Sequence, residues 1–91
     1  MSGIFNCAHN FNQPLNKWNV SNVKDMRILF RKATSFNQPI YNWNVSKVKD
    51  MESMFEDAVN FNQTLLEWNV SNVKDMTDIF KGATAFNKRD D

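Results

Sequence analysis

The amino-acid sequence predicts an α/β fold in which a short strand and a short helix alternate along a solenoid of stacked repeats. Three observations carry this prediction. The motif F-N-Q-x-x-x-x-W-N-V-S-x-V-K-D-M-x-x-x-F-x-x-A occurs three times at a fixed period, beginning at Phe11, Phe36 and Phe61. The second half of each repeat has apolar residues at helical spacing, and the first half has features of an extended chain. A fixed period of this size is typical of units that stack on copies of themselves.

The period divides the chain into one solenoid domain that spans residues 1–91. The domain contains a partial repeat (1–10), three full repeats (11–35, 36–60 and 61–85) and a second partial repeat (86–91). Thirteen of the 25 positions are identical in all three full repeats. Because inward positions must match the repeats on either side while outward positions are free to vary, we expect most identical positions to form the core.

The second half of each repeat predicts a short helix, over about residues 25–34 in the first full copy. Met26, Leu29, Phe30 and Ala33 have the spacing i, i+3, i+4 and i+7, which gives one apolar stripe on a helix. Asp25 directly precedes the stripe and is a favourable N-cap residue. A helix this short is not stable alone in water, so we expect it to pack against the helices of neighbouring repeats.

The first half of each repeat predicts a short strand, near residues 14–20, 39–45 and 64–70. Pro14 and Pro39 oppose helix, and Trp18 and Val20 alternate as they would on a strand with one face inward. One strand and one helix per repeat give a period within the range of leucine-rich repeats. We therefore expect a leucine-rich-repeat-like solenoid with a parallel sheet, in which tryptophan stacks on tryptophan and phenylalanine on phenylalanine.

Polar residues also recur at the period. We expect Asn and Gln columns to satisfy backbone groups as buried amide ladders, at Asn12, Asn37, Asn62 and Asn87 and at Gln13, Gln38 and Gln63. Charges alternate between copies, because Arg27, Arg31 and Lys32 become Glu52, Glu56 and Asp57. In-register stacking would place basic side chains against acidic ones, where each exposed pair contributes about 0.2–1 kcal/mol.

Composition excludes several function classes. The net charge of +1 offers no general attraction to nucleic acid or anionic membrane, and no apolar run is long enough for a membrane helix. The start of the chain lacks a secretory signal, so we expect no leader or lipid anchor of its own. Cys7 is the only cysteine and His9 the only histidine. With no glycine-rich phosphate loop either, we predict no catalytic, cofactor or metal site and no enzyme activity.

The string W-N-V-S-x-V-K-D-M, together with M-F-x-x-A-x-x-F-N-Q, resembles the repeat of BspA-like surface proteins. It is most similar to their mycoplasma lipoprotein-associated branch, also described as palindromic amphipathic repeat coding elements. Trp43, Val45, Met51, Phe55 and Ala58 carry much of the resemblance, with their equivalents one period away on either side. The resemblance implies a leucine-rich-repeat-like solenoid on cell-surface proteins or lipoproteins, with roles in adhesion, host interaction and surface variation.

The variable positions are the candidate interaction surface. One set lies outside the predicted strand and the other on the outer face of the predicted helix; the residues are Lys17, Tyr41, Asn42, Leu66, Glu67, Arg27, Arg31, Glu52 and Glu56. The function we expect is a non-enzymatic cell-surface module for protein interaction or adhesion, with a protein or host-surface partner. The alternative is a purely structural array that self-associates end to end through apolar, uncapped repeat faces. We expect no nucleic-acid partner and no direct membrane insertion.

Overall fold

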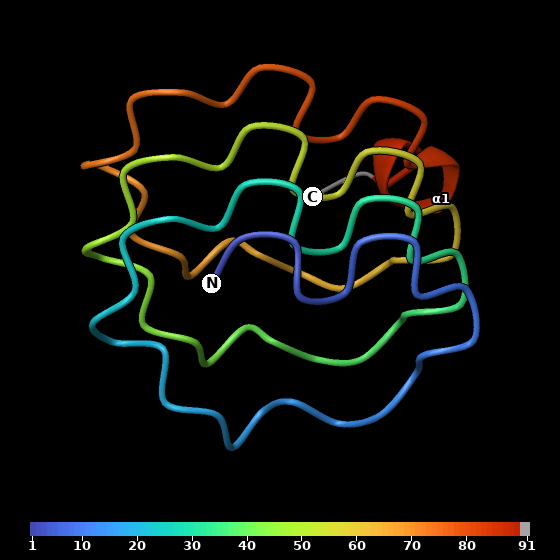
Figure 1. The fold of residues 1–91 in the computed structure, drawn as a ribbon, viewed down its shortest axis with the longest axis horizontal. Coiled ribbons are helices and arrows are strands. Elements are labelled where there is room, and N and C mark those ends of the chain that lie inside the picture. Colours follow the sequence, from blue (N-terminus) through green and yellow to red (C-terminus); the bar gives the residue numbers. More distant parts are fainter. Residues whose placement is uncertain (90–91) are drawn as a thin grey trace.

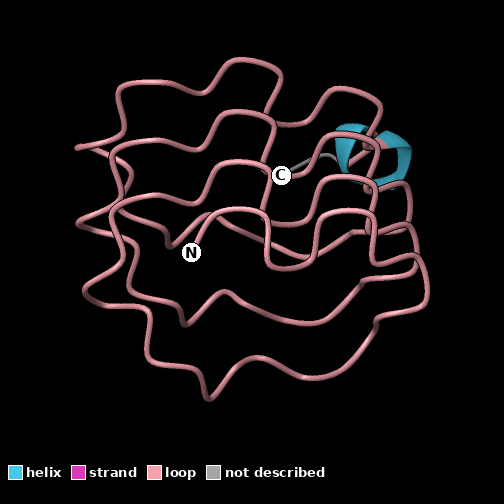
Figure 2. Ribbon diagram, in the orientation of Figure 1, coloured by secondary structure: helices cyan, strands magenta, loops and turns pink. Residues whose placement is uncertain are grey.

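The computed structural model describes residues 1–89, and the path of the chain repeats with the period of the sequence. Successive repeats lie one above another, so the chain forms four layers: residues 1–25, 26–50, 51–75 and 76–89 (Figure 1). The molecule measures 27 × 24 × 20 Å. Within the described residues the only helix is the four-residue α1 (Thr84–Asn87), and the only β-bridges are the isolated parallel pairs Asp25↔Asp50 and Asp50↔Asp75 (Figure 2).

The predicted α/β leucine-rich-repeat-like solenoid is therefore wrong. No parallel sheet forms among residues 1–89, and the repeats contain neither the expected strand nor the expected helix. The compact stack is built instead from turns and irregular chain, whose backbone groups bond from one layer to the next.

The predicted helix over 25–34 is a pair of consecutive four-residue turns. The N–H of Leu29 donates to the carbonyl of Met26 at 3.4 Å, and that of Ala33 to Phe30 at 3.0 Å. The third residue of the second turn, Lys32, has a φ of 58°, which an α-helix does not contain. Since the first and fourth residues of each turn point inward, two such turns in succession reproduce the apolar spacing of a helix.

Backbone bonds that a helix would keep within itself instead join the layers. In layer 2 the N–H groups of Ile28 and Phe30 donate to the carbonyls of Glu52 and Met54, at 2.9 and 2.8 Å. The same bonds recur between layers 1 and 2 and between layers 3 and 4. These inter-layer rows satisfy backbone groups that would otherwise be left unpaired in the interior.

The predicted helix caps act in turns. The Asp25 carboxylate accepts the N–H of Arg27 at 3.0 Å, two residues later, which is an Asx-turn. Asp50 and Asp75 make the equivalent bond at 2.9 Å each. The aspartates thus bind the backbone as N-caps would, but no helix follows.

The predicted strands are also interrupted by turns. The N–H of Trp18 donates to the carbonyl of Leu15 at 3.0 Å, and the same turn recurs at Trp43 and Trp68. A four-residue turn reverses the chain in the middle of each predicted strand. Trp43 and Trp68 are nonetheless buried, as expected for an inward face, but Trp18 in the first layer is 44% exposed.

Stacked aromatic rings fill the core. Phe5, Phe30, Phe55 and Phe80 form one column with ring centroids 5.5 Å apart at each step. A second column steps at 5.9 Å and contains Phe11, Phe36, Phe61 and Phe86. The Trp43 and Trp68 rings lie 6.5 Å apart and nearly parallel. These columns confirm that like residues stack in register, and they hold the layers together by apolar burial and ring contact.

The expected amide columns form, but at the surface. Asn12 Oδ1 accepts the N–H of Asn37 at 2.9 Å, and Asn37 Oδ1 accepts that of Asn62 at 2.9 Å. Gln38 and Gln63 add side-chain bonds to the same asparagines. Asn12 and Asn62 are exposed, so the prediction of a buried ladder is wrong.

The fourth layer ends the amide column. Asn87 lies in α1, and its N–H donates to Ala83 within the helix. Arg89 Nη1 contacts both the carbonyl and Oδ1 of Asn62, at 3.1 and 2.9 Å. A single nitrogen of Arg89 therefore donates to the acceptors that an asparagine and a glutamine bind in the layers before it.

Candidate interaction surface

Two sets of variable residues were predicted to form an interaction surface, and each lies on a different segment of the layers. One set lies at the tips of the turns closed by Trp18, Trp43 and Trp68, and we call this the turn ridge: residues Asn16, Lys17, Tyr41, Asn42, Leu66 and Glu67. The other lies on the double-turn segment, and we call it the charged face: Arg27, Arg31, Glu52 and Glu56. The aromatic columns lie between the two segments.

The turn ridge is exposed along its whole length. Its three tips occupy equivalent positions in consecutive layers, and Asn42 Nδ2 donates to the Asn16 carbonyl at 2.8 Å, which fixes two of the tips together. Tyr41 is 48% exposed and Leu66 is 71% exposed. Two large apolar side chains in adjacent layers, flanked by polar and charged neighbours, make a small mixed patch on a rigid base.

The charged face is partly neutralised by its own ion pairs. Arg31 Nε lies 3.4 Å from a Glu56 carboxylate oxygen one layer away, as the alternation of charge predicted. Arg27 behaves differently: it pairs with Asp25, two residues before it in the chain, at 3.1 Å and lies 3.9 Å from Asp50. Within residues 1–89 no ion pair joins Arg27 to Glu52, although, after the larger effect of Asp25, the Glu52 charge contributes to raising the pKa of Arg27.

The bond from Arg27 also affects titration. Its side-chain hydrogen bond to Asp25 lowers the pKa of that carboxyl group below its ordinary value, against a smaller opposing effect of burial. The same contact raises the pKa of the arginine. With Arg27 and Arg31 both paired, the charged face offers less free charge to a partner than the sequence suggests.

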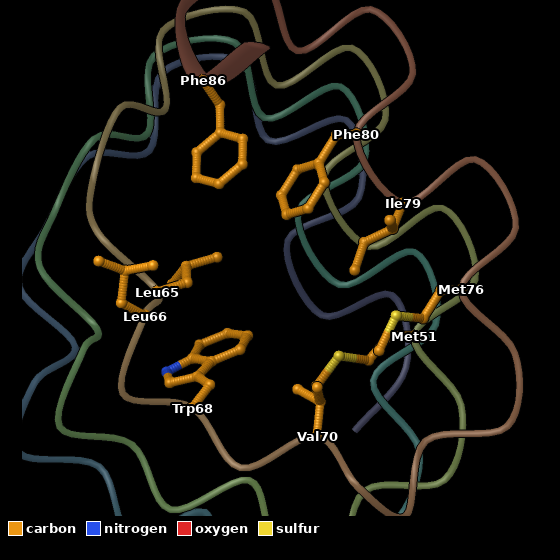
Figure 3. A pocket seen from close by; sticks show the side chains of 9 residues that line it. All are labelled: Met51, Leu65, Leu66, Trp68, Val70, Met76, Ile79, Phe80 and Phe86. Atoms are coloured by element: carbon orange, nitrogen blue, oxygen red, sulfur yellow. The ribbon is translucent and has the colours of Figure 1, made fainter. Parts of the chain in front are cut away.

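Sequence reasoning anticipated apolar ends of the stack but not their shape. A pocket opens on the last layers, lined only by apolar and aromatic side chains: Met51, Leu65, Leu66, Trp68, Val70, Met76, Ile79, Phe80 and Phe86 (Figure 3). Leu65, Leu66 and Trp68 approach from one segment, and Met76, Ile79 and Phe80 from the other. The pocket was not predictable as a site because all of its residues except Leu66 also fit a core position of the repeat.

No group of three or more His, Cys, Asp or Glu side chains among residues 1–89 could hold a metal ion. Cys7 is exposed. In the same part of the chain, no helix has the length and apolarity needed to cross a membrane. What the geometry offers is surface for contact.

A family model described as "Mycoplasma protein of unknown function, DUF285" matches residues 1–91. The chain belongs to this family. No curated protein and no solved structure is detectably similar to the chain. DUF285 membership agrees with a mycoplasma repeat protein and, since the family has no assigned function, leaves function to be argued from the surfaces described above.

Proposed function

We propose that this DUF285 chain is a non-enzymatic repeat module for protein interaction, which binds its partner through the turn ridge. The observation that carries the proposal is the pair Tyr41 and Leu66, two large apolar side chains at equivalent tips of adjacent layers that are 48% and 71% exposed. Their position varies between polar and apolar residues among repeats, while the buried positions stay apolar. A constant core with variable exposed tips is an arrangement that binds specifically without altering its fold.

Two further considerations support adhesion to a protein on a host surface. The resemblance of the W-N-V-S-x-V-K-D-M string to the BspA-like surface proteins, and to their lipoprotein-associated mycoplasma branch, suggests display outside the cell in the parent protein. The turn ridge also has the composition of a protein-contacting patch, with an aromatic and an aliphatic anchor surrounded by Asn, Lys and Glu. We therefore propose adhesion to a protein on a host surface.

The test uses fluorescently labelled protein titrated onto cultured epithelial cells. We expect saturable binding that the double variant Tyr41→Ala/Leu66→Ala reduces roughly tenfold or more, since central anchors dominate interface energies. Asn10→Ala, at an exposed position in another segment, is the control and should bind as the parent does. Binding unchanged by the double variant, with the circular dichroism of all three proteins alike, would overturn the turn ridge as the binding surface.

A second candidate is end-to-end self-association, which the unpaired backbone groups of the two end layers favour. In layer 4 the N–H groups of Asp78, Phe80 and Gly82 donate to no group among residues 1–89, whereas their equivalents in layers 1 to 3 donate to the next layer. In layer 1 the carbonyls of Ser2, Ile4 and Asn6 accept no bond in that same range. Donors and acceptors recur in the register that joins layers internally, so one copy could continue another. Sedimentation equilibrium at rising concentration tests this candidate, and a strict monomer at millimolar protein would exclude it.

A further inference from the structure

The apolar pocket at the end of the stack has the features of a vacant place for one more half-repeat. In each of the first two layers, the Leu/Ile and Val positions of this face are covered by the same segment of the following layer. Leu15 and Ile40 are at most 3% exposed, and Val20 and Val45 likewise. Their layer-3 equivalents Leu65 and Val70 are only half-buried, and they line the pocket (Figure 3).

Within residues 1–89, one backbone carbonyl at the pocket, that of Leu65, lacks the indole donor that its equivalents in the preceding layers have. Trp43 Nε1 donates to the Leu15 carbonyl at 2.9 Å, and Trp68 Nε1 donates to the Ile40 carbonyl at 3.0 Å. The Leu65 carbonyl is the third acceptor in this series. It accepts the N–H of Trp68 at 3.1 Å, as Ile40 accepts that of Trp43, but no indole among the described residues reaches it.

We infer that this pocket binds an extended peptide segment of the pattern [Leu/Ile]-x-x-Trp-Asn-Val-Ser-x-Val-Lys, supplied by another polypeptide that carries the same repeat. The indole of the segment would stack on Trp68 and donate to the Leu65 carbonyl, and its Leu or Ile would lie over Leu65. The interface continues the contact that already joins layers 1 to 2 and 2 to 3 inside the chain. Leu66 belongs to both the pocket and the turn ridge, whereas Tyr41 lies only in the ridge and Met76 only in the pocket. Single variants of Tyr41 and Met76 therefore let either proposal fail alone.

The contacts of the last layer limit the length of the segment. The Phe-Asn-Gln start of a repeat bonds through its asparagine and glutamine to the asparagine of the preceding layer. Arg89 already holds the Asn62 oxygen atoms, at 3.1 and 2.9 Å. The bound segment therefore begins after the Phe-Asn-Gln start, at the Leu or Ile. It extends to the Lys, whose N–H would donate to the Lys74 carbonyl, just as the N–H of Lys74 donates to the Lys49 carbonyl at 2.8 Å.

A whole folded second copy does not fit this place. The first segment of such a copy is of the double-turn type and matches the open N–H groups of Asp78, Phe80 and Gly82. If that first segment docked on layer 4, the Trp18 segment of the second copy would lie one layer beyond the pocket. It could not reach Leu65, because the pocket occupies the half-layer between Leu65 and that segment. An extended peptide segment meets both requirements of the pocket, the apolar contacts and the indole donor.

The experiment titrates the blocked peptide Ile-Tyr-Asn-Trp-Asn-Val-Ser-Lys-Val-Lys, the sequence of residues 40–49, into isotopically labelled protein and follows amide and methyl chemical shifts. We expect saturable shifts at the pocket residues, among them Met51, Leu65 and Ile79. Replacing the peptide tryptophan by alanine should weaken binding at least tenfold, since the indole supplies both the largest apolar area and the donor for the Leu65 carbonyl.

Matched protein variants separate the pocket from the other end of the stack. Met76 and Ile4 are apolar residues exposed at 40% and 54%, the first in the pocket and the second in layer 1. Met76→Asp should weaken peptide binding at least tenfold and Ile4→Asp should not change it. Absence of shifts at millimolar peptide, or equal affinity for the alanine peptide, would refute the inference. Self-association that Met76→Asp abolishes, without peptide binding, would assign the pocket to a second copy instead.

Discussion

Trp43 Nε1 donates a hydrogen bond to the Leu15 carbonyl at 2.9 Å, across a layer boundary and between residues 28 positions apart. Both residues are buried, at 4% and 3% exposure. Trp43→Phe keeps a ring in the core but removes the donor, so we expect a loss of about 1–3 kcal/mol in the free energy of unfolding. Urea denaturation measures the loss.

Trp18 supplies the control for that prediction. Its ring contacts Phe5 but is 44% exposed, and its indole donates to no group among residues 1–89. Trp18→Phe should therefore cost much less than Trp43→Phe. Equal costs would show that ring burial alone, and not the buried bond, determines the stability of the column.

The ion pair between Arg31 and Glu56 predicts a small coupling energy. The two side chains are 30% and 16% exposed, so solvent screens their attraction. A double-mutant cycle with Arg31→Ala and Glu56→Ala should give about 0.2–1 kcal/mol, decreasing at high salt. As a control, Lys81→Ala replaces Arg31→Ala in the cycle, since Lys81 is at the position equivalent to Arg31 two layers on. This cycle should give no coupling, because no ion pair joins Lys81 to Glu56 within residues 1–89. A coupling that does not respond to salt would contradict a screened pair.

Lys32 occupies left-handed backbone space, with a φ of 58°. Its equivalent in layer 4 is Gly82, where a Cβ would meet the Asp57 side chain. Lys32→Gly should raise the free energy of unfolding by about 1 kcal/mol, because glycine adopts this conformation without the Cβ penalty. Lys24→Gly, at an exposed residue outside the positive-φ set, should instead destabilise. Thermal denaturation distinguishes the two, and a destabilised Lys32→Gly would contradict the prediction.

The lowered pKa of Asp75 predicts that the protein loses stability in acid. Its hydrogen bonds to Thr77, of which the backbone bond has the largest effect, lower its pKa below the ordinary value, and the Arg27 contact does the same for Asp25. A depressed folded-state pKa stabilises the fold above the unfolded-state value of about 3.9, and this contribution disappears as the pH falls through the folded-state pKa. Asp75→Asn keeps the acceptor oxygen but cannot titrate. Its stability, measured by urea denaturation, should therefore decrease less than that of the parent below about pH 4, and parallel curves would refute the assignment.

Sequence reasoning predicted the register of this protein but not its local backbone. The repeat period, the stacked phenylalanines, the buried Trp43 and the Arg31 to Glu56 contact all follow from the repetition of residues, which aligns equivalent positions whatever the local conformation. The stripe through Met26, Leu29, Phe30 and Ala33 did not distinguish a helix from two turns, because both place residues with that spacing on one side.

The signal that favoured turns was weak. A turn with positive φ at its third residue usually shows glycine or asparagine there, and Gly3 and Gly82 do so in the outer layers. The inner layers place Ile28, Lys32, Ser53 and Asp57 in the same conformation. Inter-layer hydrogen bonds and the aromatic columns offset the cost of this conformation, and neither can be inferred from one repeat read alone. The turn ridge was identified because its tips vary, whereas the pocket depends on which layer is last.

Every inter-layer bond of the stack spans about one period; the shortest joins positions such as Gly3 and Arg27, and the longest joins Leu15 and Trp43. Among residues 1–89, these bonds join each layer only to its immediate neighbours. Duplicating or deleting one complete repeat would therefore leave all remaining contacts in place, since each new boundary repeats an existing one. Unequal recombination between the repeats of the gene can therefore change the number of layers in the protein. Each product of such a recombination still encodes a stack that folds.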